Sequence, residues 1–205
     1  MYNQTLSPME KEFEMLIQTF MNDKIGICND FLSTELSNQL KGNLLKLISE
    51  KLMVAAGTGN EETTNHDSLI RSDSIYWLDK KNNNTEETKF LNLIEDFITY
   101  LNMSCYTGIT TCEFHYSLYE AGSFYKKHRD QFKNNESRQY SLITYLNADW
   151  QKKDGGELKI HHLTNPQLIS PLQGKTVFFK SNEIIHEVLE TNQRRMSVTG
   201  WLKKD

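Results

Sequence analysis

Two side chains that can share one metal ion stand two residues apart near the middle of the chain. His128 and Asp130 flank Arg129. In an extended strand, residues i and i+2 project to the same face and the residue between them projects to the other. A neutral imidazole and a carboxylate on one face can bind a divalent metal, and in non-haem iron sites the third ligand is typically a second histidine. Because short His-x-Asp strings are common, the pair alone does not separate a metal site from solvated surface.

Two segments near the C-terminus supply what this pair lacks. His186 lies in the apolar run 184–188, which favours a strand that carries the imidazole into an interior. Nine residues after it begins the run 195–202, where alternation puts a cation, two hydroxyls and an indole on one face. Such a face suits a polar cavity, and the alternative is an edge strand whose polar side meets water. The residues on that face are Arg195, Ser197, Thr199 and Trp201.

Further motifs accompany these residues: YLNADW at 145–150, GGEL at 155–158 and TGW at 199–201. Taken together, the pattern over about 113–202 resembles the prolyl-hydroxylase branch of the iron(II)- and 2-oxoglutarate-dependent dioxygenases. The closest likeness is to the hypoxia-factor prolyl hydroxylases and their bacterial relatives. Upstream, the stretch 70–78 resembles the family's substrate-side strand that contains Arg-Gly-Asp, with Ser72 in place of the glycine. The combination is far more specific than any one motif.

The resemblance implies a metal centre and its cosubstrate. By likeness, His128, Asp130 and His186 would bind Fe(II), and Arg195 would pair with the far carboxylate of 2-oxoglutarate. A guanidinium meets a carboxylate with two parallel hydrogen bonds, which suits an anion buried deep in a barrel. Arg194 has the opposite parity in its strand and is not the candidate. Ascorbate is a further candidate cofactor on the same resemblance.

Three residues of one strand are candidates for the cosubstrate pocket. Tyr145 shares a face with Ser141 and Ile143, so its hydroxyl could give the far carboxylate another hydrogen bond. Without the resemblance, Tyr145 reads as an ordinary core tyrosine.

Four residues are candidates for the substrate side of the cavity. Trp201 follows Arg195 by an even count and therefore shares its face, and Tyr119 is a second aromatic candidate. Aromatic core packing is the alternative for both. Arg71 and Asp73 match the family's substrate-contacting positions, although an exposed Arg and Asp need no function.

One rival metal pair exists in the sequence. Glu113 and His115 stand two residues apart in the predicted strand 111–119, so they also share a face. This pair lacks the downstream partners that distinguish His128 and Asp130.

The composition of the 205 residues bounds the remaining possibilities. A formal net charge of −4 gives no electrostatic reason to expect nucleic-acid or membrane binding. Three cysteines without a Cys-x-x-Cys spacing argue against a disulfide framework and fit a reducing compartment. No signal peptide and no apolar run of membrane-spanning length is evident. We therefore expect a cytoplasmic protein.

Periodicity predicts helices first and strands afterwards. Helices are expected near 8–22, 33–53 and 86–103, with short strands at 25–28 and 69–78 and a flexible polar loop at 55–67. Eight strands follow, near 111–119, 124–129, 139–147, 156–162, 167–170, 175–180, 184–190 and 194–202. The predicted fold is a single α+β domain covering 1–205. In it, 1–110 form mainly helical support and 111–205 form a double-stranded β-helix, or jelly roll, with the helices packed on one outer face.

Three functional hypotheses fit this reading. The first is a hydroxylase of prolyl residues in a protein, with a flexible proline-containing segment bound between the 55–80 region and the 131–138 loop. The second is a dioxygenase acting on a small molecule such as a free amino acid. The third is a non-catalytic jelly-roll binding module, and the intact set of His128, Asp130, His186 and Arg195 counts against it.

Overall fold

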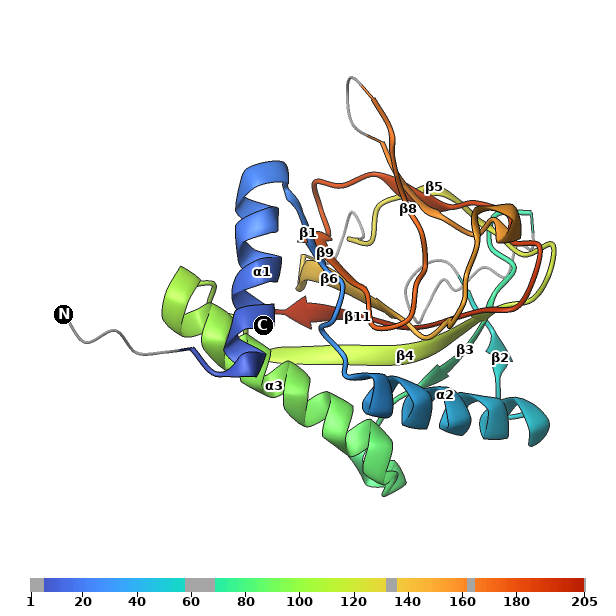
Figure 1. The fold of residues 1–205 in the computed structure, drawn as a ribbon, viewed down its shortest axis with the longest axis horizontal. Helices are drawn as coiled ribbons and strands as arrows, with labels where there is room; N and C mark the ends of the chain where they lie inside the picture. The colour runs from blue at the N-terminus through green and yellow to red at the C-terminus, as the bar shows by residue number, and fades with distance from the viewer. Residues whose placement is uncertain (1–5, 58–68, 132–135, 162–164, 205) are drawn as a thin grey trace.

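The computed structural model of the chain describes residues 6–57, 69–131, 136–161 and 165–204. In this part of the chain, three long helices lie on one side of a large sheet, and a smaller sheet lies on its other side (Figure 1). The predicted jelly roll with helices on one outer face is thus confirmed. Most of the loop expected at 55–67, and part of the loop at 131–138, fall outside the described residues.

The helices begin where their capping residues predict. α1 (Pro8–Asp23) starts at Ser7, whose hydroxyl accepts from the Glu10 N–H while the Glu10 carboxylate accepts from the Ser7 N–H. α2 (Thr34–Ser49) starts after the N-cap Ser33. It ends before the expected position near 53, because Lys51 adopts a positive φ of 59°. α3 spans Thr85–Cys105, and short 3₁₀ helices span Lys80–Asn82 and Lys152–Asp154.

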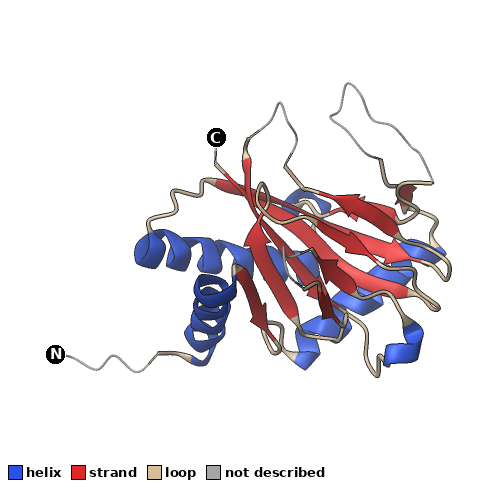
Figure 2. Ribbon diagram, turned by 90° about the horizontal axis from the view of Figure 1, so that it is seen from above, coloured by secondary structure: helices blue, strands red, loops and turns tan. Residues whose placement is uncertain are grey.

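Two antiparallel sheets form the jelly roll (Figure 2). The large sheet has the order β1-β9-β6-β11-β4-β3-β2 and the small sheet the order β5-β10-β7-β8. The strands of the large sheet are β1 (Ile25–Cys28), β9 (Thr176–Lys180), β6 (Arg138–Tyr145), β11 (Arg195–Lys203), β4 (Thr111–Tyr119), β3 (Ser74–Trp77) and β2 (Val54–Ala55). Those of the small sheet are β5 (Tyr125–His128), β10 (His186–Val188), β7 (Leu158–Ile160) and β8 (Gln167–Ile169).

Two expected segments differ from the structure. The strand expected at 69–78 pairs as a strand only over Ser74–Trp77, and Arg71 makes an isolated bridge to Tyr125 of the small sheet. The chain therefore crosses from one sheet to the other at this point. The two-residue strand β2 lies at the edge of the predicted loop and pairs with β3.

Alternation along the central strands gives the large sheet two different sides. Met196, Val198 and Leu202 of β11 belong to the apolar core beneath the helices. Arg195, Ser197, Thr199 and Trp201 project to the other side and face the small sheet, where a second apolar cluster surrounds the polar residues described below. Gly200 leaves room for the neighbouring strand β4, since a Cβ there would overlap with the Glu113 carbonyl oxygen and the Phe114 ring.

Candidate metal and cosubstrate site

The structure brings His128, Asp130 and His186 together. One ligand atom from each lies within 4.8 Å of the other two, and among the described residues this is the one such group of three. Oδ1 of Asp130 is 3.3 Å from Nε2 of His128 and 3.6 Å from Nε2 of His186. All three ligand atoms therefore converge on one point, as a single metal ion requires.

Two neighbouring strands position the histidines. His128 ends β5 and His186 begins β10, and the two residues are directly opposite each other in the antiparallel register. Asp130 lies just beyond the end of β5 and is only 8 % exposed. The two side chains therefore lie together, as strand parity predicted, although the strand ends at His128.

A bulge in β5 adds an aromatic residue that sequence parity missed. His186 pairs with His128, but Val188 pairs with Tyr125, so β5 has one more residue than β10 between the two pairs. The Tyr125 and His128 rings consequently stack, with centroids 3.5 Å apart and planes tilted by 15°. An odd spacing of three would otherwise place these rings on opposite faces.

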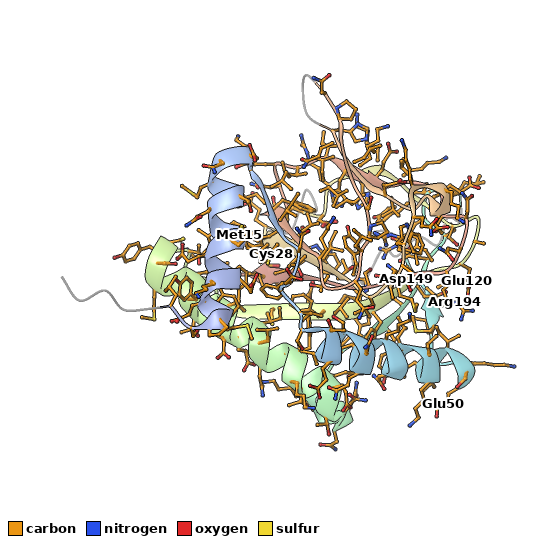
Figure 3. All side chains as sticks on the ribbon, in the orientation of Figure 1. Met15, Cys28, Glu50, Glu120, Asp149 and Arg194 are labelled. Carbon is orange, nitrogen blue, oxygen red and sulfur yellow. The ribbon has the colours of Figure 1, made fainter. Side chains whose placement is uncertain are left out.

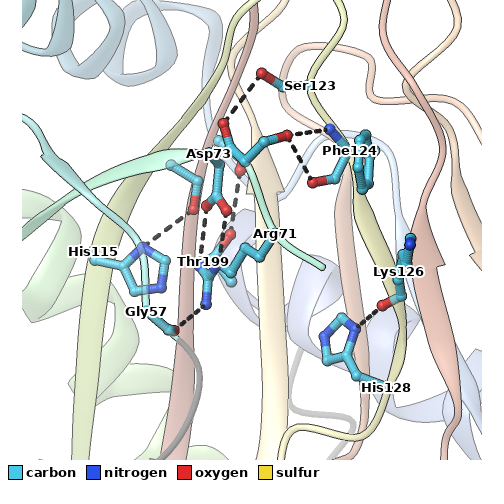
Figure 4. A network of polar contacts seen from close by, with 12 residues as sticks. Gly57, Arg71, Asp73, His115, Ser123, Phe124, Lys126, His128 and Thr199 are labelled. Carbon is cyan, nitrogen blue, oxygen red and sulfur yellow. Dashed lines mark hydrogen bonds and ion pairs between the residues drawn. The ribbon is translucent and has the colours of Figure 1, made fainter. Parts of the chain in front are cut away.

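Hydrogen bonds to the backbone orient both imidazoles. Nδ1 of His128 lies 2.7 Å from the Lys126 carbonyl oxygen. Figure 4 marks this contact with a dashed line. Because a carbonyl only accepts, Nδ1 carries a proton, and Nε2 is the ring nitrogen that faces Asp130 and is placed to bind a metal. His186 repeats the arrangement more loosely, with Nδ1 3.5 Å from the Ile184 carbonyl oxygen.

The charge states of the group suit a cation. Burial, and then the neighbouring His128, lower the pKa of His186 to about 4, so its imidazole is neutral. Burial raises the pKa of Asp130, but His186, His128 and a hydrogen bond from Ser141 outweigh it and hold that pKa well below its usual range. A carboxylate and the neutral His186 imidazole suit a divalent iron ion.

Arg195 is a buried cation on the same side of the large sheet. It is 1 % exposed, and its Nε donates to the Gly156 carbonyl oxygen at 2.8 Å. Gly156 has a φ of 67°, and a Cβ there would lie 3.0 Å from Cδ of Arg195. No carboxylate among the described residues forms an ion pair with Arg195. An unpaired buried charge is costly, so this guanidinium fits an anionic ligand.

Two tyrosines flank this guanidinium. The ring centres of Tyr119 and Tyr145 lie 4.9 Å and 5.0 Å from the central carbon of Arg195. The buried Tyr145 hydroxyl has no partner in good hydrogen-bond geometry within the described residues. Burial raises the pKa of Tyr145 to about 12, although the nearby Arg195 guanidinium opposes this shift. Ile143, two residues before it, is 5 % exposed and belongs to the cluster between the sheets. The residues present therefore fit the far carboxylate of 2-oxoglutarate, which needs a cation and a neutral hydroxyl donor.

The parity distinction between the two arginines agrees with their placement. Arg194 lies on the outside, where its guanidinium pairs with the Glu120 carboxylate at 2.8 Å (Figure 3). Tyr119, expected on the substrate side, lies beside Arg195 instead, because the two residues pair directly between β4 and β11.

Arg71 and Asp73 pair with each other. Nε and one terminal nitrogen of Arg71 meet the two Asp73 oxygens at 2.6 Å and 3.0 Å, and Asp73 is 2 % exposed (Figure 4). Burial lowers the pKa of Arg71, but Asp73 outweighs this effect and raises it. The guanidinium carbon also lies 4.6 Å from the centre of the Tyr125 ring. The ion pair thereby connects the 70–77 segment to the ring that stacks on His128.

Ser72 has its own bonding role. Its hydroxyl accepts from the Phe124 N–H at 3.0 Å, and its own N–H donates to the Phe124 carbonyl oxygen at 3.1 Å. A glycine could make only the second of these bonds. The serine thus ties this segment to the residue just before β5.

Trp201 belongs to an aromatic wall together with Trp77 and His115. Its ring centre lies 6.3 Å from Trp77 and 5.5 Å from His115. The Arg138 guanidinium carbon lies 3.5 Å from the Trp201 ring, whose buried indole N–H has no hydrogen-bond partner within the described residues. Trp201 therefore offers an unused donor on the inner side of β11.

The rival pair of Glu113 and His115 is occupied otherwise. The Glu113 carboxylate binds Arg138 at 2.8 Å and Lys203 at 3.3 Å. Nδ1 of His115 lies 3.1 Å from both the Tyr116 carbonyl oxygen and the Ser117 hydroxyl. Neither residue belongs to the metal-ligating group.

Comparison with known families decides what this site belongs to. Residues 114–203 match the 2OG-Fe(II) oxygenase superfamily. This segment is a 2OG-Fe(II) oxygenase domain. Members of that family use Fe(II) and 2-oxoglutarate, so the two cofactors expected from the sequence are confirmed at the level of the family, and the domain indicates an enzyme.

Relatives of the oxygenase domain include prolyl hydroxylases. Human Egl nine homolog 1 is 28 % identical over 201 residues, which cover 87 % of this chain and 44 % of that protein. Xenopus laevis prolyl 3-hydroxylase OGFOD1 is 27 % identical over 159 residues, covering 69 % of this chain and 30 % of that protein. The chain spans about half the length of the Egl nine homologs it matches.

A solved prolyl-4-hydroxylase has the same architecture. The Pseudomonas putida enzyme superposes with a TM-score of 0.84 at 26 % identity, over 94 % of this chain and 99 % of that one.

Among the described residues, no helix has the length and apolar character needed to cross a membrane.

Proposed function

We propose that this protein hydroxylates a prolyl residue in a protein substrate, using Fe(II), 2-oxoglutarate and dioxygen and releasing succinate and carbon dioxide. The observation that carries the proposal is the cluster of His128, Asp130 and His186 on the same side of the large sheet as the buried, unpaired Arg195. A cation site and an anion site on one side of the large sheet suit a cosubstrate that carries a chelating end and a distant carboxylate.

In this proposal each residue has a defined task. His128, Asp130 and His186 would hold Fe(II), which supplies the activation of dioxygen that protein side chains cannot. Arg195 binds the far carboxylate, and Tyr145 donates its otherwise unused hydroxyl to the same group. Fixing that end orients the cosubstrate, and the enclosing side chains exclude water.

The substrate class rests on the relatives and on two groups of side chains. One solved prolyl hydroxylase of the same fold, from Trichoplax adhaerens, is in complex with a hypoxia inducible factor peptide fragment. It is 23 % identical, with a TM-score of 0.84 over 95 % of this chain and 90 % of that one. At this identity the likeness supports the fold alone. The paired Arg71 and Asp73 lie against Tyr125, and the aromatic wall around Trp201 lines the large sheet. We infer that a flexible proline-containing segment binds across these two features. Ascorbate as a reductant and a cytoplasmic location remain predictions.

A peptide-library assay with Fe(II) and 2-oxoglutarate tests the proposal. We expect certain proline-containing peptides to gain the mass of one oxygen atom, mapped to a prolyl residue by tandem mass spectrometry, with an equal amount of succinate. Asp130→Ala should abolish both products. If a free amino acid is hydroxylated as well as any peptide, the substrate is a small molecule and the protein-substrate proposal is wrong.

A further inference from the structure

A pair of buried serines stands behind the metal-ligating carboxylate. The Ser141 hydroxyl donates to Oδ2 of Asp130 at 2.6 Å, and the Ser141 and Ser181 hydroxyls lie 2.9 Å apart. Both serines are fully buried. Oδ1, the other oxygen of Asp130, is the one that faces both imidazoles.

The direction of these hydrogen bonds follows from proton counting. An ionised carboxylate can only accept, and each serine has one hydroxyl proton. The Ser141 hydroxyl therefore donates its proton to Asp130, and in the contact between the serines the Ser181 hydroxyl must donate to the Ser141 oxygen. The order of donation is Ser181 to Ser141 to Asp130.

This arrangement ties Asp130 to the opposite sheet. Asp130 lies beyond the end of β5, whereas Ser141 belongs to β6 and Ser181 directly follows β9. The backbone strengthens the link, since the Gln131 N–H donates to the Ser181 carbonyl oxygen at 3.3 Å and the Ser181 N–H donates to the Gln139 carbonyl oxygen at 3.0 Å. The Asp130 carboxylate, which lies outside any strand, is thus held by Ser141 of β6 and, through it, by Ser181 at the end of β9.

We propose that Ser141 and Ser181 are positioning residues that fix the Asp130 carboxylate so that one oxygen, Oδ1, is presented to the metal. Ser141, expected from the sequence to line the cosubstrate pocket, acts here through a metal ligand instead. The inference rests on the proposed metal site. Partners that orient a metal ligand typically contribute 10- to 100-fold to metal affinity, so we expect a loss of about that size on removing Ser141.

The same two strands provide a matched control. Thr144 of β6 and Thr176 of β9 are also fully buried, and their hydroxyls lie 2.8 Å apart. Neither contacts a metal ligand, and alternation puts Thr144 on the side of β6 opposite to Ser141. Removing this pair disturbs the packing of the same strands without touching Asp130.

The experiment measures Co²⁺ and Mn²⁺ binding to the metal-free protein by calorimetry, together with the visible ligand-field spectrum of the Co²⁺ complex. We expect Ser141→Ala to weaken binding about 10- to 100-fold and to shift the spectrum, and Ser181→Ala to do so less. The double variant should match Ser141→Ala, because Ser181 acts through Ser141. Thr144→Ala should leave affinity and spectrum unchanged.

The outcomes separate this inference from the proposed function. Wild-type affinity and spectrum in Ser141→Ala would overturn it, as would an equal loss in Thr144→Ala. Additive losses in the double variant would contradict the order of donation. If the serine variants behave as expected but no peptide is hydroxylated, the positioning role stands and the proposed function fails. If Asp130→Ala binds metal as well as the wild type, both fail.

Discussion

The two sides of the large sheet are built from the same strands but differ in kind. On the helix-facing side, Phe97 packs against Phe13, Phe31 and Phe178 with ring centres 5.1 to 5.7 Å apart. On the inner side, facing the small sheet, the largest fully buried side chain is that of Arg195. One residue of offset along β11 separates an apolar core from a cation without a carboxylate partner among the described residues. Stability and ligand binding are thus assigned to alternate residues of one strand.

This comparison predicts that the largest loss of stability comes from the helix-facing side. Phe97→Ala should lower the free energy of unfolding by about 3–5 kcal/mol, because a buried ring is replaced by a cavity among three other aromatic rings. Urea denaturation measures this loss. At temperatures where the variant is folded, its Co²⁺ affinity should equal that of the wild type. A parallel loss of metal affinity would show that the two sides are not independent.

On the inner side, the largest loss should be in ligand binding. Arg195→Ala should weaken 2-oxoglutarate binding to the metal-loaded protein by about 2–5 kcal/mol, since the far carboxylate would be buried without its cation. Arg194→Ala is the matched control, because that exposed residue pairs with Glu120, and its loss should change affinity little. Calorimetry gives both values, and comparable losses would contradict the placement of the two guanidinium groups.

The buried His115 predicts how acid affects the inner side. Burial is the main cause that lowers the pKa of His115 to about 4 from an ordinary value of 6.5. The unfolded chain therefore takes up a proton between these two pH values while the folded protein does not. Stability should fall by up to about 3 kcal/mol as the pH drops from 6.5 towards 4.

His115→Gln tests this expectation, since it removes the titrating group. Unfolding free energies of the metal-free protein at pH 7 and pH 5 should differ less in the variant than in the wild type. His186 adds a pH dependence of the same sign in both proteins, because its pKa is also lowered. An unchanged difference would mean that His115 is protonated or solvated in the folded state.

The smallest expected effect has opposite signs for stability and for binding. Tyr145→Phe removes a buried hydroxyl that has no partner within the described residues. The ligand-free variant should be as stable as the wild type or more so, because the cost of burying that group disappears. Its 2-oxoglutarate affinity should fall by about 1.5–3 kcal/mol, the value of a hydrogen bond to a charged group. A variant with unchanged affinity would make Tyr145 an ordinary core tyrosine.

Local sequence patterns predicted most of the fold. Helical periodicity predicted α1 near 8–22, and alternation gave β4 with its observed bounds, because a strand with one apolar side has only one favourable register. The same alternation distinguished Arg195, which is buried at the start of β11, from Arg194, which lies exposed just before it. These patterns depend only on residues close together in the sequence, so they can be recognised without the structure.

The missed features depend on contacts between distant segments. Tyr125 reaches His128 through a bulge that follows from pairing with β10, and Ser181 meets Ser141 across 40 residues of sequence. The backbone oxygen of Gly156 that binds Arg195 is 39 residues away from it. No periodicity records such pairs, and the hydroxyl of Ser72 was interpreted only as a departure from glycine.

A crystal structure of the protein with Mn²⁺ and 2-oxoglutarate, grown without dioxygen turnover, tests the central claim most directly. The account predicts an anomalous peak bonded to His128, to His186 and to Oδ1 of Asp130, with the far carboxylate of 2-oxoglutarate paired to Arg195. A metal bound elsewhere, or a cosubstrate whose far carboxylate leaves Arg195 unpaired, would contradict it.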